Sequence, residues 1–329
     1  MATGRFLLKR AVQGVFVIWG VVTVVFLLRF VTPGSPITFI APLDASEALR
    51  QQIAADLGLN QPIYVQYVDY LVSLLQGDMG YSYIFGTEAE TLIFSRLPAT
   101  LELAIAATIV AVVLSIPLGV ISATHRHQPA DYGATTFSLV GISTPNFWLG
   151  IMLVLVLAVQ FSLFPTSRRV VGFLPAIETL FTEWSVDRLV TWLAHITLPA
   201  ITLGTYFTAL ITRLTRSGML DELGKTYIRA SRAKGLPETL VRYKHALRNT
   251  LIPVITVVGL QLGTLIGGAV ITEAVFAWPG LGSLVIDAIN ARDWPLIQGS
   301  LIVIGAGFVI VNLLVDGLYA TLNPQVANE

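Results

Sequence analysis

The chain has 329 residues, of which 54% are hydrophobic and only 12% are charged, and its mean hydropathy is +0.74. Soluble domains carry about 25% charged residues, so this composition excludes an ordinary water-soluble domain and predicts a membrane protein with a surface in contact with lipid. Cysteine is absent, which excludes disulfides, thiol catalysis and cysteine-ligated metal sites, and the net charge of zero gives no indication of nucleic-acid binding.

Six stretches are long enough to cross a bilayer, which requires about 20 residues. In chain order they are Ala11–Leu28, Leu103–Thr124, Tyr132–Ser167, Leu189–Thr212, Asn249–Thr272 and Trp294–Val315. The first follows a basic N-terminus, but it is too long for the apolar part of a signal peptide and lacks a cleavage site, so we interpret it as a retained anchor. The sequence therefore predicts an all-α membrane protein with six transmembrane helices.

The distribution of charge predicts the orientation of these helices. With the N-terminus in the cytoplasm, 13 Lys and Arg residues fall inside and 7 outside, whereas 6 acidic residues fall inside and 14 outside. Cytoplasmic loops are enriched in Lys and Arg. Six spans place both ends of the chain on one side, so we expect both termini to be cytoplasmic.

We divide the chain into four regions on this basis. Residues 1–31 form the cytoplasmic N-terminus and the first span, 32–97 an external helical segment, 98–321 a five-helix transmembrane core that includes the loop 218–249, and 322–329 a cytoplasmic tail. In the external segment, Ser46 is suited to cap a helix that Gly58 ends, and Pro62 is suited to open a second helix that ends at Gly77. We interpret the segment as a small cap packed on the spans; a further contact with a substrate-delivery protein stays open.

The second, third and fourth spans contain residues that break or perturb helices. Pro117 and Pro145 predict kinks, because proline removes a helical hydrogen bond, and Pro199 is expected either to kink or to open the fourth span. Asn146 follows Pro145 at membrane depth, so it is expected either to line a translocation path or to make a packing hydrogen bond. His125 and His127 have the spacing of a metal pair, but no third ligand is evident, so we predict interfacial histidines and no metal site.

The fifth span carries a repeated G-x-x-x-G pattern at Gly259, Gly263 and Gly267, which predicts a face pressed against another span or a second subunit. Gln261 and Thr264 on the same span are further candidates for the translocation path. The loop Phe276–Gly299 that follows is too apolar to lie freely in water. It is expected to fold back against the bundle as a lid or to meet a partner.

The most basic part of the sequence lies between the fourth and fifth spans, at residues 218–249. It holds seven Lys and Arg residues against three acidic ones, a net charge of +4: Lys225, Arg229, Arg232, Lys234, Arg242, Lys244, Arg248, Asp221, Glu222 and Glu238. Gly235 is placed to stop one helix and Pro237 to start the next. We predict a cytoplasmic helical hairpin that forms a docking surface for another protein.

This hairpin resembles the cytoplasmic EAA motif of ABC-importer permeases, in the form found in the peptide, nickel and opine family. Arg229, Ala230 and Ser231 stand at the Glu-Ala-Ala positions, and Gly235 stands at the glycine that follows. Other strings resemble the same family in the same order: TPGSP, LGLNQPIYVQY, QGDMGYS, RLPATLELA, HALRNTLIP and the segment 276–299. The long external segment is typical of the B-type subunit of this family.

The resemblance implies a bacterial or archaeal inner-membrane importer that contains a C-type permease subunit, two cytoplasmic ABC ATPases and an external substrate-binding protein. It also implies that the hairpin couples this chain to the ATPases and contacts them through the following residues: Arg229, Ala230, Ser231, Arg232, Lys234 and Gly235. ATP and Mg²⁺ would be bound by the ATPases, with no cofactor in this chain. The substrate would belong to the peptides, nickel complexes, opines or glutathione.

Other function classes are less well supported by the residues. Gly224-Lys225-Thr226 resembles the end of a phosphate-binding loop, but Met219 occupies the position that requires glycine. An ion-gradient-driven secondary transporter is the main alternative; it would need buried ionisable groups, and Glu102, Glu273 and Asp316 are predicted near span ends. An intramembrane enzyme lacks a catalytic constellation, and a DNA-reading helix-turn-helix is disfavoured because basic loops are expected on a cytoplasmic face.

Overall fold

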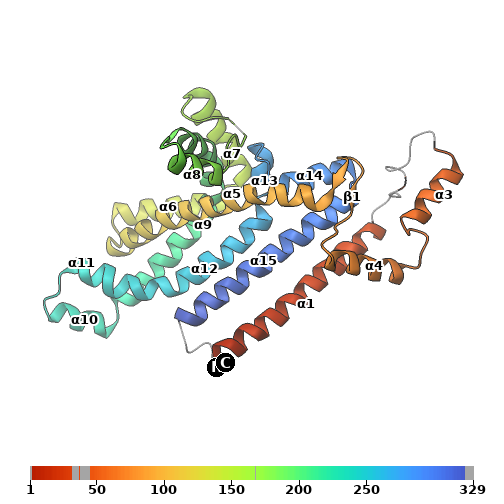
Figure 1. Cartoon of the computed structure of the whole chain (residues 1–329). Helices are drawn as coiled ribbons and strands as arrows, with labels where there is room; N and C mark the ends of the chain where they lie inside the picture. Colours follow the sequence, from red (N-terminus) through yellow and green to blue (C-terminus); the bar gives the residue numbers. More distant parts are fainter. Residues whose placement is uncertain (1, 32–36, 38–44, 167, 323–329) are drawn as a thin grey trace.

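The computed structural model describes residues 2–31, 37, 45–166 and 168–322, so the TPGSP motif and the tail after Leu322 lie outside the described residues. Long helices dominate the chain (Figure 1). They are α1 (Ala2–Val31), α5 (Ala89–Thr124), α9 (Asp187–Leu223), α12 (Leu247–Gly268) and α15 (Trp294–Leu322). Within the described part of the chain, five helices are long and apolar enough to cross a membrane, or six if one bent pair is counted as a span. The all-α membrane fold is confirmed.

The bent pair is the predicted third span. It consists of α6 (Pro129–Ser143) and α7 (Asn146–Leu153), the latter continued by a π-helical segment, η1 (Val154–Gln160), and it bends by 107° at the break. Thr144 is extended there, with ψ 123°, because a residue before proline is disfavoured in the helical region. The expected kink at Pro145 is therefore a full break.

Several helices extend beyond the spans that the sequence predicted. Helix α5 begins at Ala89 rather than at Leu103, and α9 continues to Leu223 rather than to Thr212. Both helices also continue through their internal prolines, Pro117 and Pro199, without interruption. Charged side chains had limited the predicted spans. In the structure two of them are paired, Glu102 of α5 with Arg169 and Arg216 of α9 with Asp131.

Close helix contacts rely on small residues. Gly204 of α9 lies so near α5 that an added Cβ would come within 2.8 Å of the Ala107 carbonyl oxygen. On α12, a Cβ at Gly259 would overlap Val315 of α15, and one at Gly263 would lie 3.3 Å from Phe308. The predicted glycine face is thus confirmed as a packing surface, and its partner is α15 of the same chain.

The segment predicted to be external contains the two predicted helices, α3 (Glu47–Asp56) and α4 (Ile63–Leu75). The Ser46 hydroxyl accepts a hydrogen bond from the Leu49 amide at 3.3 Å, which confirms the predicted cap. Gly58 and Gly77, with φ of 65° and 87°, follow the two helix ends. A short antiparallel hairpin that the sequence did not predict, β1 (Tyr81–Ser82) with β2 (Thr87–Glu88), leads into α5.

The apolar segment after α12 folds back into the bundle, as one of its two interpretations predicted. It forms α13 (Val270–Val275) and α14 (Leu281–Ala291), and Phe276 and Trp278 are among the largest fully buried side chains. Glu273 is completely buried: it accepts a hydrogen bond from the Thr100 hydroxyl at 2.7 Å and from the Ser283 amide at 2.9 Å. The carboxylate thereby caps the N-terminus of α14. The sequence placed Glu273 near a span end, and the structure shows that the side chain is buried in the packed bundle there.

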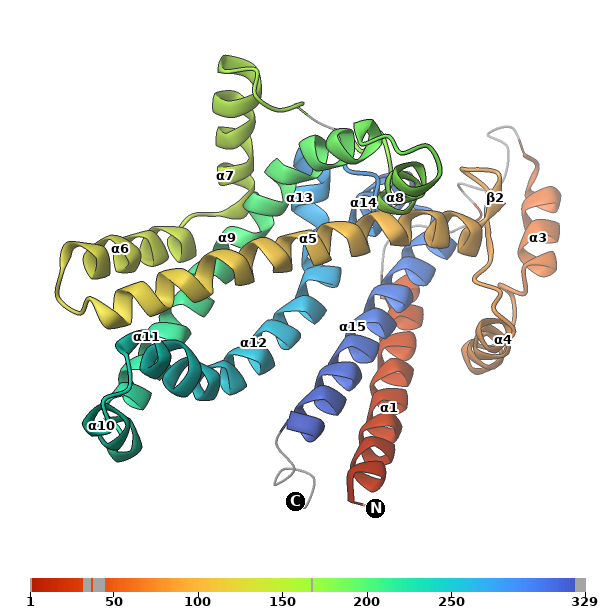
Figure 2. The ribbon, with the colours of Figure 1, turned by 60° about the vertical axis from the view of Figure 1, so that its left-hand side comes forward.

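The start of α1 and the end of α15 lie at one end of the bundle, as does the basic hairpin with α10 (Thr226–Ala233) and α11 (Glu238–Leu240) (Figure 2). At this end Arg10 of α1 pairs with Asp316 of α15 at 3.3 Å. At the opposite end lie the β-hairpin, α14 and α8 (Phe173–Thr182), which precedes α9.

Candidate functional site

The basic hairpin is built as the sequence predicted, as helix, break and helix. After α9 ends at Leu223, α10 is closed by Gly235, whose φ of 76° lies in the left-handed region that glycine adopts without strain. Pro237 caps α11, which continues through a π-helical turn, η2 (Val241–Ala246), into α12. The second arm of the hairpin is therefore continuous with the fifth span.

One side of the hairpin is apolar and buried against the bundle. Ile228 of α10 is completely buried, and Val241 and Ala246 of the second arm lie beside it. They pack in one cluster with residues of two spans: Val120 and Ala123 of α5, and Met219 of α9. The hairpin is thus seated on the ends of α5 and α9 as well as joined to α12.

Polar contacts fix the base of the hairpin. The Tyr227 hydroxyl donates to Glu222 at 2.5 Å and accepts from the Asn249 amide at 3.0 Å, so α10 is tied to α9 and α12 together. Lys225 pairs with Glu222 at 2.5 Å. This hydrogen bond raises the pKa of Lys225, and burial followed by the Glu222 contact raises the pKa of the Tyr227 phenol. Both groups therefore stay protonated at neutral pH.

The opposite side of the hairpin is basic and exposed, and it brings the predicted contact residues together. Exposed positions are Arg229, Ala230, Arg232, Lys234 and Gly235, while Ser231 is half-buried and donates to the Tyr227 carbonyl at 2.9 Å. Arg232 pairs with Glu238 across the bend at 2.7 Å, which holds the two arms together. The side chain of Ala230 leaves the backbone of α10 accessible between the arginines.

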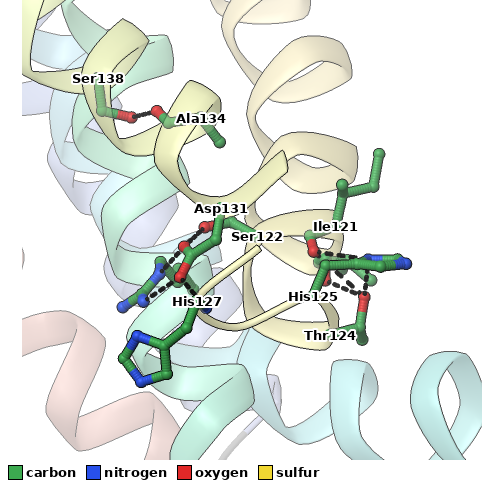
Figure 3. Close-up of polar contacts among 10 residues, drawn as sticks. Ile121, Ser122, Thr124, His125, His127, Asp131, Ala134 and Ser138 are labelled. Carbon is green, nitrogen blue, oxygen red and sulfur yellow. Dashed lines mark hydrogen bonds and ion pairs between the residues drawn. The ribbon is translucent and has the colours of Figure 1, made fainter. Parts of the chain in front are cut away.

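A buried ion pair near the hairpin was not predicted from the sequence. Asp131 at the start of α6 accepts from Arg216 of α9 at 2.7 and 2.9 Å, from the Ser122 hydroxyl at 2.5 Å, and from the His127 amide at 3.0 Å (Figure 3). Its side chain is only 4% exposed. This pair joins the third span to the fourth. The only indication in the sequence is a lone Asp at the head of an apolar run.

The two histidines of this loop are separated rather than paired. The His125 ring contacts the Thr124 hydroxyl and the Ile121 carbonyl, whereas the His127 ring lies on the other side of the loop (Figure 3). Among the described residues, no group of three His, Asp or Glu side chains is placed to hold a metal ion.

The three residues predicted for a translocation path are only partly brought together. Thr264 donates to the carbonyl and the side-chain oxygen of Gln261, at 2.7 and 3.1 Å, so these two form one polar patch on α12. Asn146 is the first residue of α7, next to the break in the third span, and α7 packs on α9 and α13. Asn146 therefore lies on α7, whereas Gln261 and Thr264 lie on α12.

An apolar groove of about 620 Å³ runs between α5 and α9. Its lining residues are Glu102, Ile105, Ala106, Ile109, Val110, Val113, Leu114, Phe173, Trp192, Leu193, Ile196, Thr197, Ala200 and Ile201. At one end Glu102 pairs with Arg169 at 2.7 Å and accepts from the Trp192 indole at 3.3 Å. None of the three predicted path residues lines this groove.

The chain is similar to known families and proteins along most of its length. Residues 115–328 match the family described as "Binding-protein-dependent transport system inner membrane component", and residues 3–104 match the N-terminal family of the same transport systems. The oligopeptide transport system permease protein AppB of Bacillus subtilis (strain 168) is 41% identical, with 98% of each chain covered. The dipeptide transport system permease protein DppB of Escherichia coli (strain K12) is 39% identical, with 99% of each chain covered.

Two further comparisons extend these similarities. The glutathione transport system permease protein GsiC of Escherichia coli O6:H1 is 36% identical, with 98% of each chain covered. Among solved structures, inward-facing conformations of the MetNI methionine ABC transporter contain a chain with a TM-score of 0.54 and 17% identity. The match covers 70% of this chain and 96% of that one, and at this identity it shows a shared fold alone.

Proposed function

Because the chain belongs to the family of binding-protein-dependent transport system inner membrane components, as a peptide-family permease of ABC importers, we propose that it forms one half of a translocation path for peptides or similar small solutes. The other half would be a C-type permease. Two cytoplasmic ATPases would drive transport, and an external binding protein would deliver the substrate. This subunit would contribute no ATP site and no cofactor of its own.

The observation that supports this proposal best is the two-sided hairpin. Its apolar side is buried on the ends of α5 and α9, and its exposed side presents small residues between basic ones. A basic surface that is seated on the bundle suits a protein partner of complementary charge. The exposed residues Arg229, Ala230, Arg232, Lys234 and Gly235, with Ser231, are proposed as the ATPase contact.

The hairpin, the start of α1 and the end of α15 lie at one end of the bundle, which supports placing both termini in the cytoplasm with the ATPases. The opposite end, with α3, α4, α8 and α14, would face the binding protein. ATP-driven closure of the ATPases would displace the hairpin, and α5, α9 and α12 would carry that displacement toward the external end. Such alternating access exposes the path to each side in turn.

The path itself is proposed to include Asn146, Gln261 and Thr264. Asn146 stands at the break in the third span, where backbone groups at membrane depth need polar surroundings. The amide and hydroxyl of Gln261 and Thr264 are turned to each other on the accessible face of α12. These groups suit hydrogen bonding to the backbone of a peptide.

The coupling role is tested by Ala230→Trp in the complete importer. Ala230 is exposed, so the subunit itself accommodates the larger side chain, while the close docking of an ATPase is blocked. We expect substrate uptake per ATP hydrolysed to fall at least tenfold, with unchanged amounts of the subunit in the membrane. Ala130→Trp is the matched control, because Ala130 is also exposed near the same end of the bundle but lies outside the hairpin. Uptake that stays fully coupled in the Ala230 variant would contradict the proposal.

A further inference from the structure

Helix α4 has an exposed apolar stripe that no contact within the described residues covers. The stripe consists of Tyr64, Val68, Val72 and Leu75, which are spaced three or four residues apart and therefore share one face of the helix. They are 72%, 55%, 47% and 88% exposed, respectively. We propose that α4 lies in the membrane interface at the end of the bundle opposite the hairpin, with this stripe in the lipid of that leaflet.

Three separate faces of α4 point to this placement. The face that meets α1 carries Tyr67 and Tyr70, whose rings pack on Phe26 with centroids 5.2 and 5.5 Å away. About a third of a turn away is the apolar stripe, and the remaining third carries Asp69 and Ser73. A helix in an interface requires this division, with one face on protein, one in lipid and one in water.

The contact with α1 sets the depth of the helix. The Tyr67 hydroxyl and the Thr23 hydroxyl are 2.6 Å apart, and Thr23 lies within the apolar span Leu7–Val31. This span of 25 residues is about 37 Å long, somewhat longer than a hydrocarbon core of about 30 Å. Thr23 is eight residues, or about 12 Å, from the end of α1, so the Tyr67 side chain reaches into the apolar part of the span rather than staying above it.

The direction of α4 and its neighbours also fit an interface. Figure 2 views α4 nearly end-on while α1 runs along the picture, so α4 lies across the span rather than parallel to it. Arg29 of α1 donates to Gln66 of α4 at 2.5 Å and lies over the Phe30 ring at 5.0 Å, as expected of a cation at a membrane surface. With 13 residues, α4 is too short to cross the bilayer.

Lipid is favoured over a protein partner because α1, the span that α4 contacts, also exposes apolar side chains around its circumference. They include Val15, Trp19 and Val24, at 68%, 48% and 59% exposure. Helix α3, by contrast, is polar, with the sequence EALRQQIAAD, and suits water. The external segment is thus interpreted as one helix in water and one in the interface, rather than as a cap wholly outside the membrane.

The absence of cysteine makes a direct test possible. Single cysteines at Tyr64, Val68, Val72 and Leu75 would be labelled with a nitroxide in the full chain, assembled with its importer partners in liposomes. The controls are Asp69 and Ser73 on the polar face of the same helix, and Val15 on the exposed face of α1 as a lipid reference. Collision with oxygen, which concentrates in lipid, and with a water-soluble nickel chelate would be measured by power-saturation electron paramagnetic resonance.

We expect the four stripe labels to be oxygen-accessible and shielded from the chelate at least fivefold relative to Asp69 and Ser73. Labels accessible to the chelate at all six positions of α4 would show that the helix is in water and overturn the proposal. Stripe labels that are immobilised and shielded from both reagents would show that a protein partner covers the stripe, and would also overturn it. The readout does not depend on transport, so it stands apart from the test of coupling.

Discussion

Ile228 is the one residue of α10 whose side chain is buried against the bundle. It is completely buried among side chains from α5, α9 and the second arm, and truncation to alanine leaves a cavity that three separate helices would have to close. Ile→Ala changes in such sites cost about 2–5 kcal/mol. Even about 2 kcal/mol corresponds to a roughly 30-fold increase in the population of the undocked hairpin.

Hydrogen–deuterium exchange on the assembled importer measures this population directly. We expect the amides of residues 226–246 to exchange at least about 30-fold faster in Ile228→Ala, and about two- to tenfold faster in Ile228→Val, for which the cost is about 0.5–1.5 kcal/mol. Tyr243→Ala removes a large side chain that is 57% exposed in the same hairpin, so its exchange should stay near that of the parent. Unchanged exchange in Ile228→Ala, or an equal increase in Tyr243→Ala, would refute the idea that this cluster anchors the hairpin.

Three further changes test other contacts. Asp131→Asn should lower the free energy of unfolding by about 3 kcal/mol or less, because it removes the charge opposite a partly exposed Arg216. The thermal midpoint of the purified complex measures this loss, and an unchanged midpoint would contradict the prediction. Gly259→Val should destabilise the α12–α15 contact by about 1–3 kcal/mol through overlap with Val315, seen as reduced assembly in native gels. Glu273→Ala should leave the N-terminus of α14 uncapped, so protease cleavage within residues 276–292 should accelerate at least tenfold; equal cleavage rates would argue against the cap.

Local residue chemistry was enough to predict much of this fold. Ser46, Gly58 and Gly77 mark helix ends because their effect depends on the few residues beside them. The hairpin was predictable for the same reason, since Gly235 and Pro237 act on their own backbone. The exposed face of the hairpin was predictable because its Lys and Arg side chains favour water. The repeat of glycines on the fifth span predicts a packing face, although it does not identify the partner.

Features that depend on distant partners were not predictable. The pairing of Asp131 with Arg216 joins residues 85 positions apart, and Glu273 with Thr100 joins residues 173 apart. Charged residues lower the hydropathy of a segment, so the predicted second and fourth spans stop before the charged parts of α5 and α9. The size of the bend at Pro145 was also beyond the sequence, because proline predicts a perturbation but neighbouring helices set the angle.

The close contact between α5 and α9 has a mechanical consequence. Helix α9 has 37 residues and is therefore a rod of about 55 Å, and Gly204, where its backbone meets Ala107, lies close to its middle. A second close approach lies nearer the hairpin, where a Cβ at Gly119 of α5 would overlap Thr215 of α9. Held at two points, α9 would have to break one of them to tilt on α5, so the two helices would turn together as one unit. A turn of about 5° about the middle of a rod of this length shifts each end by about 2 Å, in opposite directions. A displacement of the hairpin would then reach the far end, where α8 lies, through both helices.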